Sequence, residues 1–212
     1  MKRSVIVTGG VSRLGAVIAT HLETLGWRVL RSSHRYDVGA DIVVDLSKEE
    51  GADLLYIAAL KLLGGKAPDA LVNNAALFAL DETDVMSLNY LAPKRLITLM
   101  SERVGVGSVV NILDTRILNH KAVTPYEKSK KALYDYTIES SRSYSGILRV
   151  NGVAPGPVLA PVSVHESAGI TPFGRPKPSD VAEAVAFLLD STVISGCVIP
   201  IDGGQSTLFS ES

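Results

Sequence analysis

Short apolar runs and helix-patterned segments alternate along this sequence, and no other feature constrains its fold as strongly. The run Val5–Val7 stops at two glycines, which is typical of a strand buried on both faces. Leu14–Leu25 then carries apolar residues at helical spacing, and Gly26 follows it as a helix stop. Repeated strand–helix alternation predicts an α/β fold, a doubly wound parallel sheet with helices on both faces.

The other expected elements follow in the same alternating order. Strands are predicted at Arg28–Leu30, Ile42–Val44, Ala70–Val72, Ser108–Leu113, Ile147–Val153 and Val198–Ile201, and helices at Lys48–Leu63, Glu82–Val104, Pro125–Ser143 and Val181–Leu189. Residues Ser32–Asp41 make the second connection unusually short, so we expect a loop in place of a crossover helix. The Pro- and Gly-rich segment Ala154–Pro178 is either a lid over a binding site or a surface excursion.

Length and composition indicate one ordinary globular domain, residues 1–212. The chain has 46% hydrophobic and 20% charged residues and a net charge of −1, so no basic field is expected to recruit nucleic acid or anionic lipid. No uninterrupted apolar run reaches the roughly 18 residues of a membrane span. Cys197 is the lone cysteine, and we expect a cytoplasmic protein without a metal site.

A glycine-containing turn follows the first strand, in the run Thr8–Gly15. Glycines there let the backbone approach a pyrophosphate, which the N-terminus of the next helix stabilises. We therefore expect Gly9, Arg13, Leu14 and Gly15 to bind a dinucleotide. The alternative is a tight strand–helix turn with no ligand.

The charges near the second strand indicate which dinucleotide is used. A site for NAD usually carries an acidic residue at this strand end, and here no carboxylate precedes Asp37. Arg13, His34 and Arg35 suit a ribose 2′-phosphate, which favours NADP(H). Solvated surface arginines are the alternative interpretation.

Tyr126 and Lys130 stand four residues apart in a predicted helix, with Asp114 upstream at a strand end. This spacing places the phenol and the ammonium on one helix face, where the ammonium is expected to lower the pKa of the phenol and suit it to proton transfer. Thr124, Pro125 and Glu127 read as the N-cap, first residue and capping box of that helix, so Tyr126 falls in its first turn.

Together these motifs resemble the short-chain dehydrogenase/reductase family over essentially the whole chain, which implies a single-domain Rossmann-type fold. The marks that carry the resemblance, in chain order, are Thr8–Gly15, Asp45, Asn73–Ala75, Asn89, Tyr126 with Lys130, Asn151–Gly156 and Asp202–Gly204. The resemblance implies a catalytic role for Tyr126 as proton donor, with Lys130 on the nicotinamide ribose.

The resemblance also implies roles for other positions. Asp45 and Leu46 would contact the adenine, Asn73 would border the ribose, and Asn89 would support a proton-relay water. The Pro155–Gly156 turn would lie beside the nicotinamide. Ala75 and Val158 complete the expected cofactor-binding set. By their residue types alone, Asn73 is equally a strand cap and Asn89 a helix-surface residue.

Asp114 stands where most members of the family place a serine. Because of this aspartate, together with Arg13 and His34–Arg35, the chain resembles pteridine reductases and bacterial dihydromonapterin reductases. Those enzymes use NADPH to reduce dihydropterins or dihydrofolates. Phe78 falls where pteridine reductases stack a phenylalanine on the pterin, unless it is a plain core residue. Asp114 would accept hydrogen bonds from the amino or ring N–H groups of the substrate.

We therefore expect an NADPH-dependent reductase whose small-molecule substrate, a dihydropterin, contacts Phe78, Asp114 and Tyr126. A carbonyl reductase, and a non-enzymatic NADP(H)-binding regulator, are the alternatives. The helical segments Glu82–Val104 and Pro125–Ser143 resemble the dimer-forming pair of the family, so a homo-oligomer, a dimer or tetramer, is expected.

Overall fold

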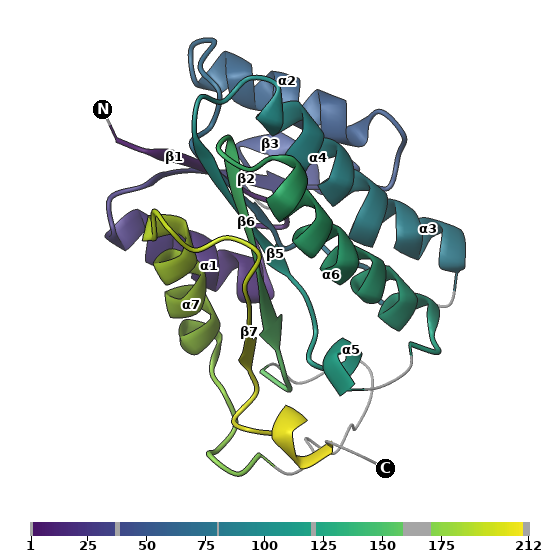
Figure 1. The fold of residues 1–212 in the computed structure, drawn as a ribbon. Coiled ribbons are helices and arrows are strands. Elements are labelled where there is room, and N and C mark those ends of the chain that lie inside the picture. Colours follow the sequence, from purple (N-terminus) through teal and green to yellow (C-terminus); the bar gives the residue numbers. More distant parts are fainter. Residues whose placement is uncertain (1, 37–38, 80, 120–121, 159–170, 210–212) are drawn as a thin grey trace.

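A seven-stranded parallel sheet, ordered β3-β2-β1-β4-β5-β6-β7, forms the centre of the computed structural model (Figure 1). The structure describes residues 2–36, 39–79, 81–119, 122–158 and 171–209. The strands of this described part are β1 Ser4–Val7, β2 Arg28–Ser33, β3 Ile42–Val43, β4 Ala70–Asn73, β5 Gly107–Ile112, β6 Leu148–Pro155 and β7 Val198–Ile201. The order reverses between β1 and β4, and the crevice at such a switch point is where doubly wound sheets bind ligands.

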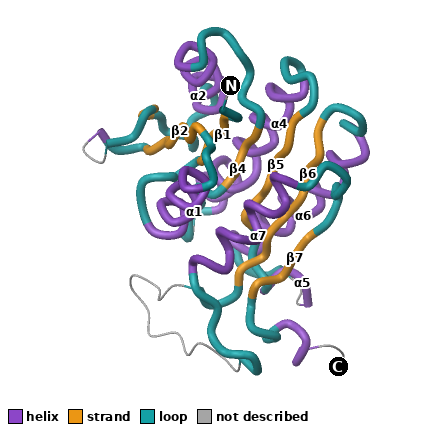
Figure 2. The backbone as a smooth tube through the Cα atoms, turned by 90° about the vertical axis from the view of Figure 1, so that its left-hand side faces the viewer, coloured by secondary structure: helices purple, strands orange, loops and turns teal. Residues whose placement is uncertain are grey.

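Helices cover both faces of the sheet, as the sequence predicts. Helices α1 (Arg13–Thr24) and α7 (Pro178–Asp190) lie on one face, in front of the strands in Figure 2. Helices α2 (Gly51–Leu62), α4 (Ala92–Ser101) and α6 (Pro125–Ser143) lie on the other. The short elements are the helices α3 (Glu82–Met86) and α5 (Arg116–Asn119), the π-helical turn η2 (Ser87–Leu91) and the 3-10 helix η3 (Ser206–Phe209).

The two-residue period of each strand divides the core into two layers. In β1, Val5 and Val7 pack in the cluster that includes α1 and α7, whereas Ile6 packs in the cluster that includes α2 and α4. All three are at most 1% exposed. Strands buried on both faces in this way read as continuous apolar runs, which explains why β1 was recognisable in the sequence.

Two regions differ from the sequence-based expectations. The segment Glu82–Val104, expected as one long helical segment, is helical without a break from Glu82 to Ser101, but its middle, η2, is π-helical and joins α3 to α4. Helix α5 was not expected at all. The short connection from β2 to β3 contains no α-helix in its described residues, and the two strands pair in parallel. Residues 159–170, within the segment considered as a lid, lie outside the described part of the chain.

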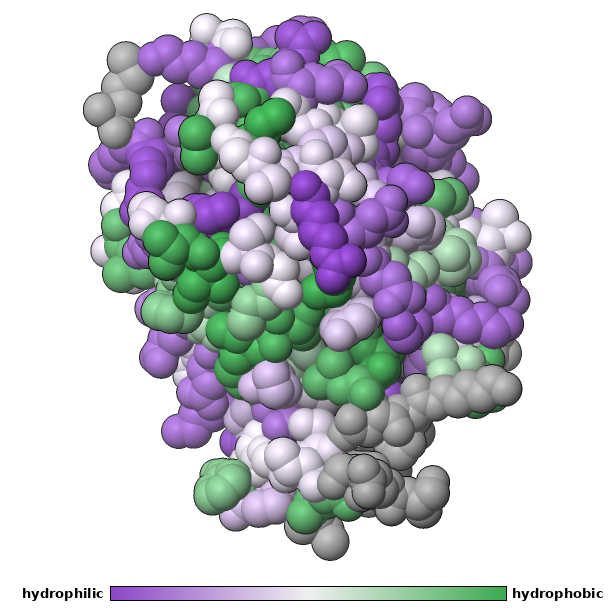
Figure 3. All heavy atoms as spheres, in the orientation of Figure 1, coloured by the Kyte–Doolittle hydropathy of each residue, from purple (hydrophilic) through white to green (hydrophobic). Residues whose placement is uncertain are grey.

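Polar and apolar residues are mixed on the molecular surface. Figure 3 shows hydrophobic patches around the middle of one face and hydrophilic residues along its upper margin. In the described part of the chain, every helix is too short or too polar to cross a bilayer.

Candidate active site

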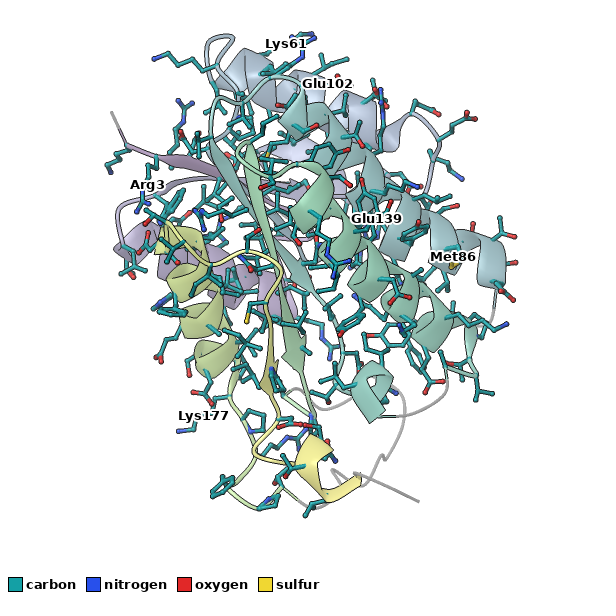
Figure 4. The ribbon with its side chains drawn as sticks, in the orientation of Figure 1. Arg3, Lys61, Met86, Glu102, Glu139 and Lys177 are labelled. Carbon is teal, nitrogen blue, oxygen red and sulfur yellow. The ribbon has the colours of Figure 1, made fainter. Side chains whose placement is uncertain are left out.

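The residues singled out in the sequence come together where the parallel strands end. The glycine turn follows β1, residues 74–79 follow β4, Asp114 follows β5, and the Pro155–Gly156 turn closes β6. In Figure 4, Lys177 at the start of α7 lies toward this end of the sheet, and Lys61 and Glu102 lie at the opposite end. The parallel topology thus brings segments far apart in sequence to one edge.

The glycine turn forms a close-packed cradle at the start of α1. Gly9 takes a left-handed φ of +64°, and a Cβ on Gly15 would lie only 2.1 Å from the carbonyl oxygen of Gly9. The N-cap Ser12 makes no side-chain cap, and the first turn holds no acidic residue. Backbone N–H groups at such a helix start can bind a phosphate, so the cradle fits a dinucleotide.

Thr8 and Asn74, which belong to two of the motifs but had no predicted role of their own, hold this cradle. The hydroxyl of Thr8 accepts hydrogen bonds from the backbone N–H groups of Asn74 (2.9 Å) and Ala75 (3.0 Å). The Asn74 amide in turn donates to the carbonyl oxygen of Thr8 over 2.9 Å. The strand ends of β1 and β4 are therefore tied together beneath the turn. The sequence signal for this role was the place of Thr8 and Asn74 in the motifs Thr8–Gly15 and Asn73–Ala75.

The basic residues proposed for the 2′-phosphate lie at the surface. Arg13, His34 and Arg35 are all exposed, and Arg13 takes a positive φ of 48° at the first residue of α1. A non-glycine residue in this region is uncommon and marks a constrained position. The Arg35 side chain donates to the His34 ring over 3.4 Å, so these two side chains are adjacent.

Asp45 and Leu46 differ in how they can reach a cofactor. Asp45 is exposed, and its carboxylate accepts hydrogen bonds from the backbone and hydroxyl of Ser47. Those bonds, and further the charges of Lys48 and His34, keep its pKa below the ordinary value. Leu46 is 6% exposed, and its side chain packs in the core. The adenine contact of both residues stays a prediction.

Tyr126 lies in the first turn of α6 and points at Asp114. The capping box of Thr124 and Glu127 is present, and Pro125 begins the helix, which confirms the predicted helix start. The Tyr126 hydroxyl donates a hydrogen bond to the Asp114 carboxylate over 3.2 Å. Lys130 is buried, and its ammonium donates to the Ile112 carbonyl oxygen over 2.8 Å. The structure therefore gathers the phenol, the carboxylate and the ammonium at the end of β5.

The expected effect of Lys130 on the pKa of Tyr126 is wrong. Burial raises the pKa of the Tyr126 phenol above its ordinary value, and the negative charge of Asp114 raises it further. The Lys130 ammonium lies 5.8 Å from the centre of the tyrosine ring and is bound to a backbone carbonyl. Burial lowers the pKa of Lys130 to about 8. Tyr126 is consequently held as a neutral phenol, the form that can give up a proton.

Asn89 is fully buried in the turn η2 and joins two walls of the site. Its side-chain oxygen accepts from the Leu77 backbone N–H (2.7 Å), and its amide donates to the Leu77 carbonyl (2.9 Å) and the Ser129 hydroxyl (3.0 Å). Ser129 donates to the Tyr126 carbonyl over 2.7 Å. Asn89 is thus no helix-surface residue. It positions the loop before Phe78 against the first turns of α6, and its predicted support of a relay water stays a prediction.

Asn73 faces the interior of the protein and not the crevice. It is 2% exposed, and its amide donates to the Asn111 side-chain oxygen over 2.8 Å. Asn111 donates in turn to the Thr137 hydroxyl over 2.8 Å. This chain links β4, β5 and α6 beneath the site. The Asn73 amide nitrogen is therefore engaged within the protein, and the expectation that Asn73 borders the ribose stays a prediction.

The Pro155–Gly156 turn packs closely against the residue that follows β7. A Cβ on Gly156 would lie 2.7 Å from the Cβ of Asp202, so the turn requires a glycine. The Gly156 N–H donates to the Ile201 carbonyl over 2.9 Å. Val158 is partly buried and packs against the core layer of α1 and α7. The contact of these residues with the nicotinamide stays a prediction.

Phe78 is not a core residue, because 65% of its surface is exposed. Its ring centre lies 5.0 Å from that of Tyr126, with the two planes tilted by 57°. The Arg116 guanidinium lies over both rings, 5.7 Å from Phe78 and 5.3 Å from Tyr126. An exposed aromatic face beside a proton donor is a suitable place for a flat ring to stack.

The chain is similar to known oxidoreductases over most of its length. A family model described as enoyl-(acyl carrier protein) reductase matches residues 12–206. The chain is 27% identical to levodione reductase of Leifsonia aquatica, covering 98% of this chain and 95% of that protein.

Two solved structures show the same fold with a bound nicotinamide cofactor. The FolM alternative dihydrofolate reductase 1 of Brucella canis, complexed with NADP, superposes with a TM-score of 0.88 at 26% identity, covering 99% of this chain and 96% of that one. The 3-alpha-hydroxysteroid dehydrogenase of Pseudomonas sp. B-0831, complexed with NADH, gives a TM-score of 0.87 at 26% identity, covering 98% of each chain.

Proposed function

This chain belongs to the short-chain dehydrogenase/reductase family of nicotinamide-dependent oxidoreductases, and we propose that it uses NADPH to reduce a dihydropterin or a related folate. The observation that carries the proposal is the pair formed by the Tyr126 hydroxyl and the Asp114 carboxylate, 3.2 Å apart beside the exposed Phe78 ring. The similarity to an NADP-bound alternative dihydrofolate reductase supports it.

Each of the site residues has its own role in the reduction of a C=N bond. Reduced nicotinamide, when bound, supplies the hydride. Tyr126 supplies the proton from its hydroxyl to the substrate nitrogen, because a phenol is protonated at neutral pH. Asp114 accepts hydrogen bonds from the amino or ring N–H groups of the substrate and so orients the ring. Phe78 offers its exposed face for stacking, worth roughly 0.5–1.5 kcal/mol beyond burial.

The preference for NADPH rests on charge at the end of β2. The cradle of Gly9 and Gly15 would hold the pyrophosphate, and Arg13, His34 and Arg35 would face the 2′-phosphate. Lys130 would hydrogen-bond the nicotinamide ribose through a further N–H of its ammonium, beside the bond to the Ile112 carbonyl.

One assay tests the proposal. NADPH oxidation is followed with dihydrobiopterin or dihydrofolate and, in parallel, with a panel of ketones, for the wild type and for Asp114→Ser. Turnover of pterins that falls in Asp114→Ser supports the proposal. Pterin reduction by Asp114→Ser at the full wild-type kcat/KM would remove Asp114 as a substrate ligand. Cofactor binding without turnover of any substrate would instead indicate a regulator.

A carbonyl reductase is the second candidate, favoured by the similarity to levodione reductase. Tyr126 and Lys130 serve a carbonyl equally well, and Asp114 would then have no substrate role. Turnover of ketones alone in the same panel decides for this candidate. A cytoplasmic homo-oligomer built on α4 and α6 remains our expectation, and gel filtration with light scattering checks its size.

A further inference from the structure

Arg116 engages the same carboxylate that Tyr126 does. Its Nε donates to Oδ1 of Asp114 over 3.1 Å and its Nη2 donates to Oδ2 over 2.9 Å, which is a two-pronged fork. Its backbone N–H also donates to Oδ1 over 2.9 Å. The guanidinium lies within 6 Å of the ring centres of both Phe78 and Tyr126. Arg116 therefore occupies both the hydrogen-bonding edge and the aromatic face of the site.

The geometry of the Arg116–Asp114 contact indicates which other groups can bind the same carboxylate. A guanidinium is planar and presents two parallel N–H donors on a shared carbon. A heterocycle with a ring N–H beside an exocyclic amino group, a cyclic guanidine, presents the same two donors in the same plane. Both can satisfy one carboxylate with a fork while the plane lies against an aromatic ring.

We propose that the Arg116 side chain stands in for the donor edge of the substrate, so that Asp114 selects a cyclic guanidine able to displace it. The inference rests on the proposed function and names the part of the substrate that the site reads. Arg116 is then a specificity-determining residue. A ligand without two adjacent N–H donors does not displace Arg116 from Asp114, and so it gains no affinity from this carboxylate.

The exposure of the pair makes displacement feasible. The Arg116 side chain is 42% exposed and that of Asp114 13% exposed. Partly solvated ion pairs of this kind are weak, so releasing Arg116 costs a ligand only about two- to fivefold in affinity. Removing the guanidinium should therefore raise, by the same two- to fivefold, the affinity of any ligand that binds the Asp114 carboxylate.

A second arginine fork supplies a matched control. Arg95 donates to Asp53 through Nε over 3.0 Å and Nη2 over 2.6 Å. The two side chains are 46% and 36% exposed, and they lie on α4 and α2, which carry none of the residues assigned to the substrate. Arg116→Met and Arg95→Met are compared with the wild type in the full chain with NADP⁺ present. Calorimetry measures the binding of 2-amino-4-hydroxypyrimidine and of 4-hydroxypyrimidine, which lacks the amino group.

We expect Arg116→Met to bind the aminopyrimidine about two- to fivefold more tightly than the wild type, with no gain for 4-hydroxypyrimidine. Arg95→Met should match the wild type for both. Equal or weaker aminopyrimidine binding by Arg116→Met overturns the proposal, because a guanidinium that merely balances Asp114 would give that result.

A direct readout in the wild type covers the case in which Arg116→Met fails to fold. The Nε–H NMR signal of Arg116 should shift when the aminopyrimidine binds, and that of Arg95 should not. An unmoved Arg116 signal at saturation contradicts displacement. Binding needs no turnover, so tighter binding without pterin reduction would leave this inference standing and remove only the proposed reaction.

Discussion

Thr8→Val should loosen the glycine cradle without changing the volume of the core. Thr8 is 2% exposed, and its hydroxyl accepts two backbone hydrogen bonds, from the Asn74 and Ala75 N–H groups at 2.9 and 3.0 Å. A valine has the same shape but cannot accept these two bonds, and it also loses the long, weak bond that the hydroxyl donates to the Val72 carbonyl oxygen over 3.4 Å. Each lost bond contributes about 1 kcal/mol net, so the free energy of unfolding should fall by about 2 kcal/mol, and the Tm by roughly 4–8 °C for a chain of this size.

Urea unfolding and the Kd for NADPH measure this effect. Thr8→Ser is the matched control, because it keeps the acceptor and loses only a methyl group. We expect Thr8→Val to unfold at lower urea with an unchanged slope, and to bind NADPH more weakly than Thr8→Ser. If Thr8→Val equals Thr8→Ser in both measurements, the two hydrogen bonds do not hold the cradle and the reasoning fails.

Three further predictions concern the cofactor and the proton donor. Gly15→Ala should abolish NADPH binding in a fluorescence titration, since its Cβ would meet the Gly9 carbonyl at 2.1 Å; near-normal affinity would show that the cradle adapts. Arg35→Ala should raise the KM for NADPH by about 3- to 10-fold and leave that for NADH unchanged, whereas equal changes would argue against a 2′-phosphate contact. Asp114→Asn should lower the pKa of Tyr126, because the carboxylate charge that raises it is gone. The phenol should still titrate above about pH 10, since burial is the larger cause, and an NMR titration of ¹³C-labelled tyrosine that shows no change would contradict the assignment.

The backbone elements were the most predictable part of this protein, because they depend on local patterns. Helix α6 and strand β7 begin and end where the sequence predicts, since Thr124 and Pro125 define a helix start by their own chemistry. The turn η2 was not predictable. Its sequence is compatible with an α-helix, and the burial of Asn89 against Leu77 and Ser129 is a tertiary contact.

The candidate site shows the same division between local and tertiary information. Spacing alone identified Tyr126 and Lys130, but the pKa of the phenol depends on which neighbour faces it in the fold. That neighbour is Asp114, whereas Lys130 is bound to a backbone carbonyl. Likewise Asn73 looked like a cofactor ligand from its position, and only the packing of β4 against β5 shows its amide bonded to Asn111.

The rate of NADPH oxidation with dihydrobiopterin, compared between the wild type and Tyr126→Phe, tests the central claim most directly. Phenylalanine keeps the ring beside Phe78 and removes only the hydroxyl that bonds to Asp114. We predict turnover by the wild type and a kcat lower by about 10²–10⁴-fold in Tyr126→Phe, with the Kd for NADPH little changed. Equal turnover by the two proteins would contradict the role of Tyr126 as proton donor, and no pterin turnover by the wild type would contradict the proposed substrate.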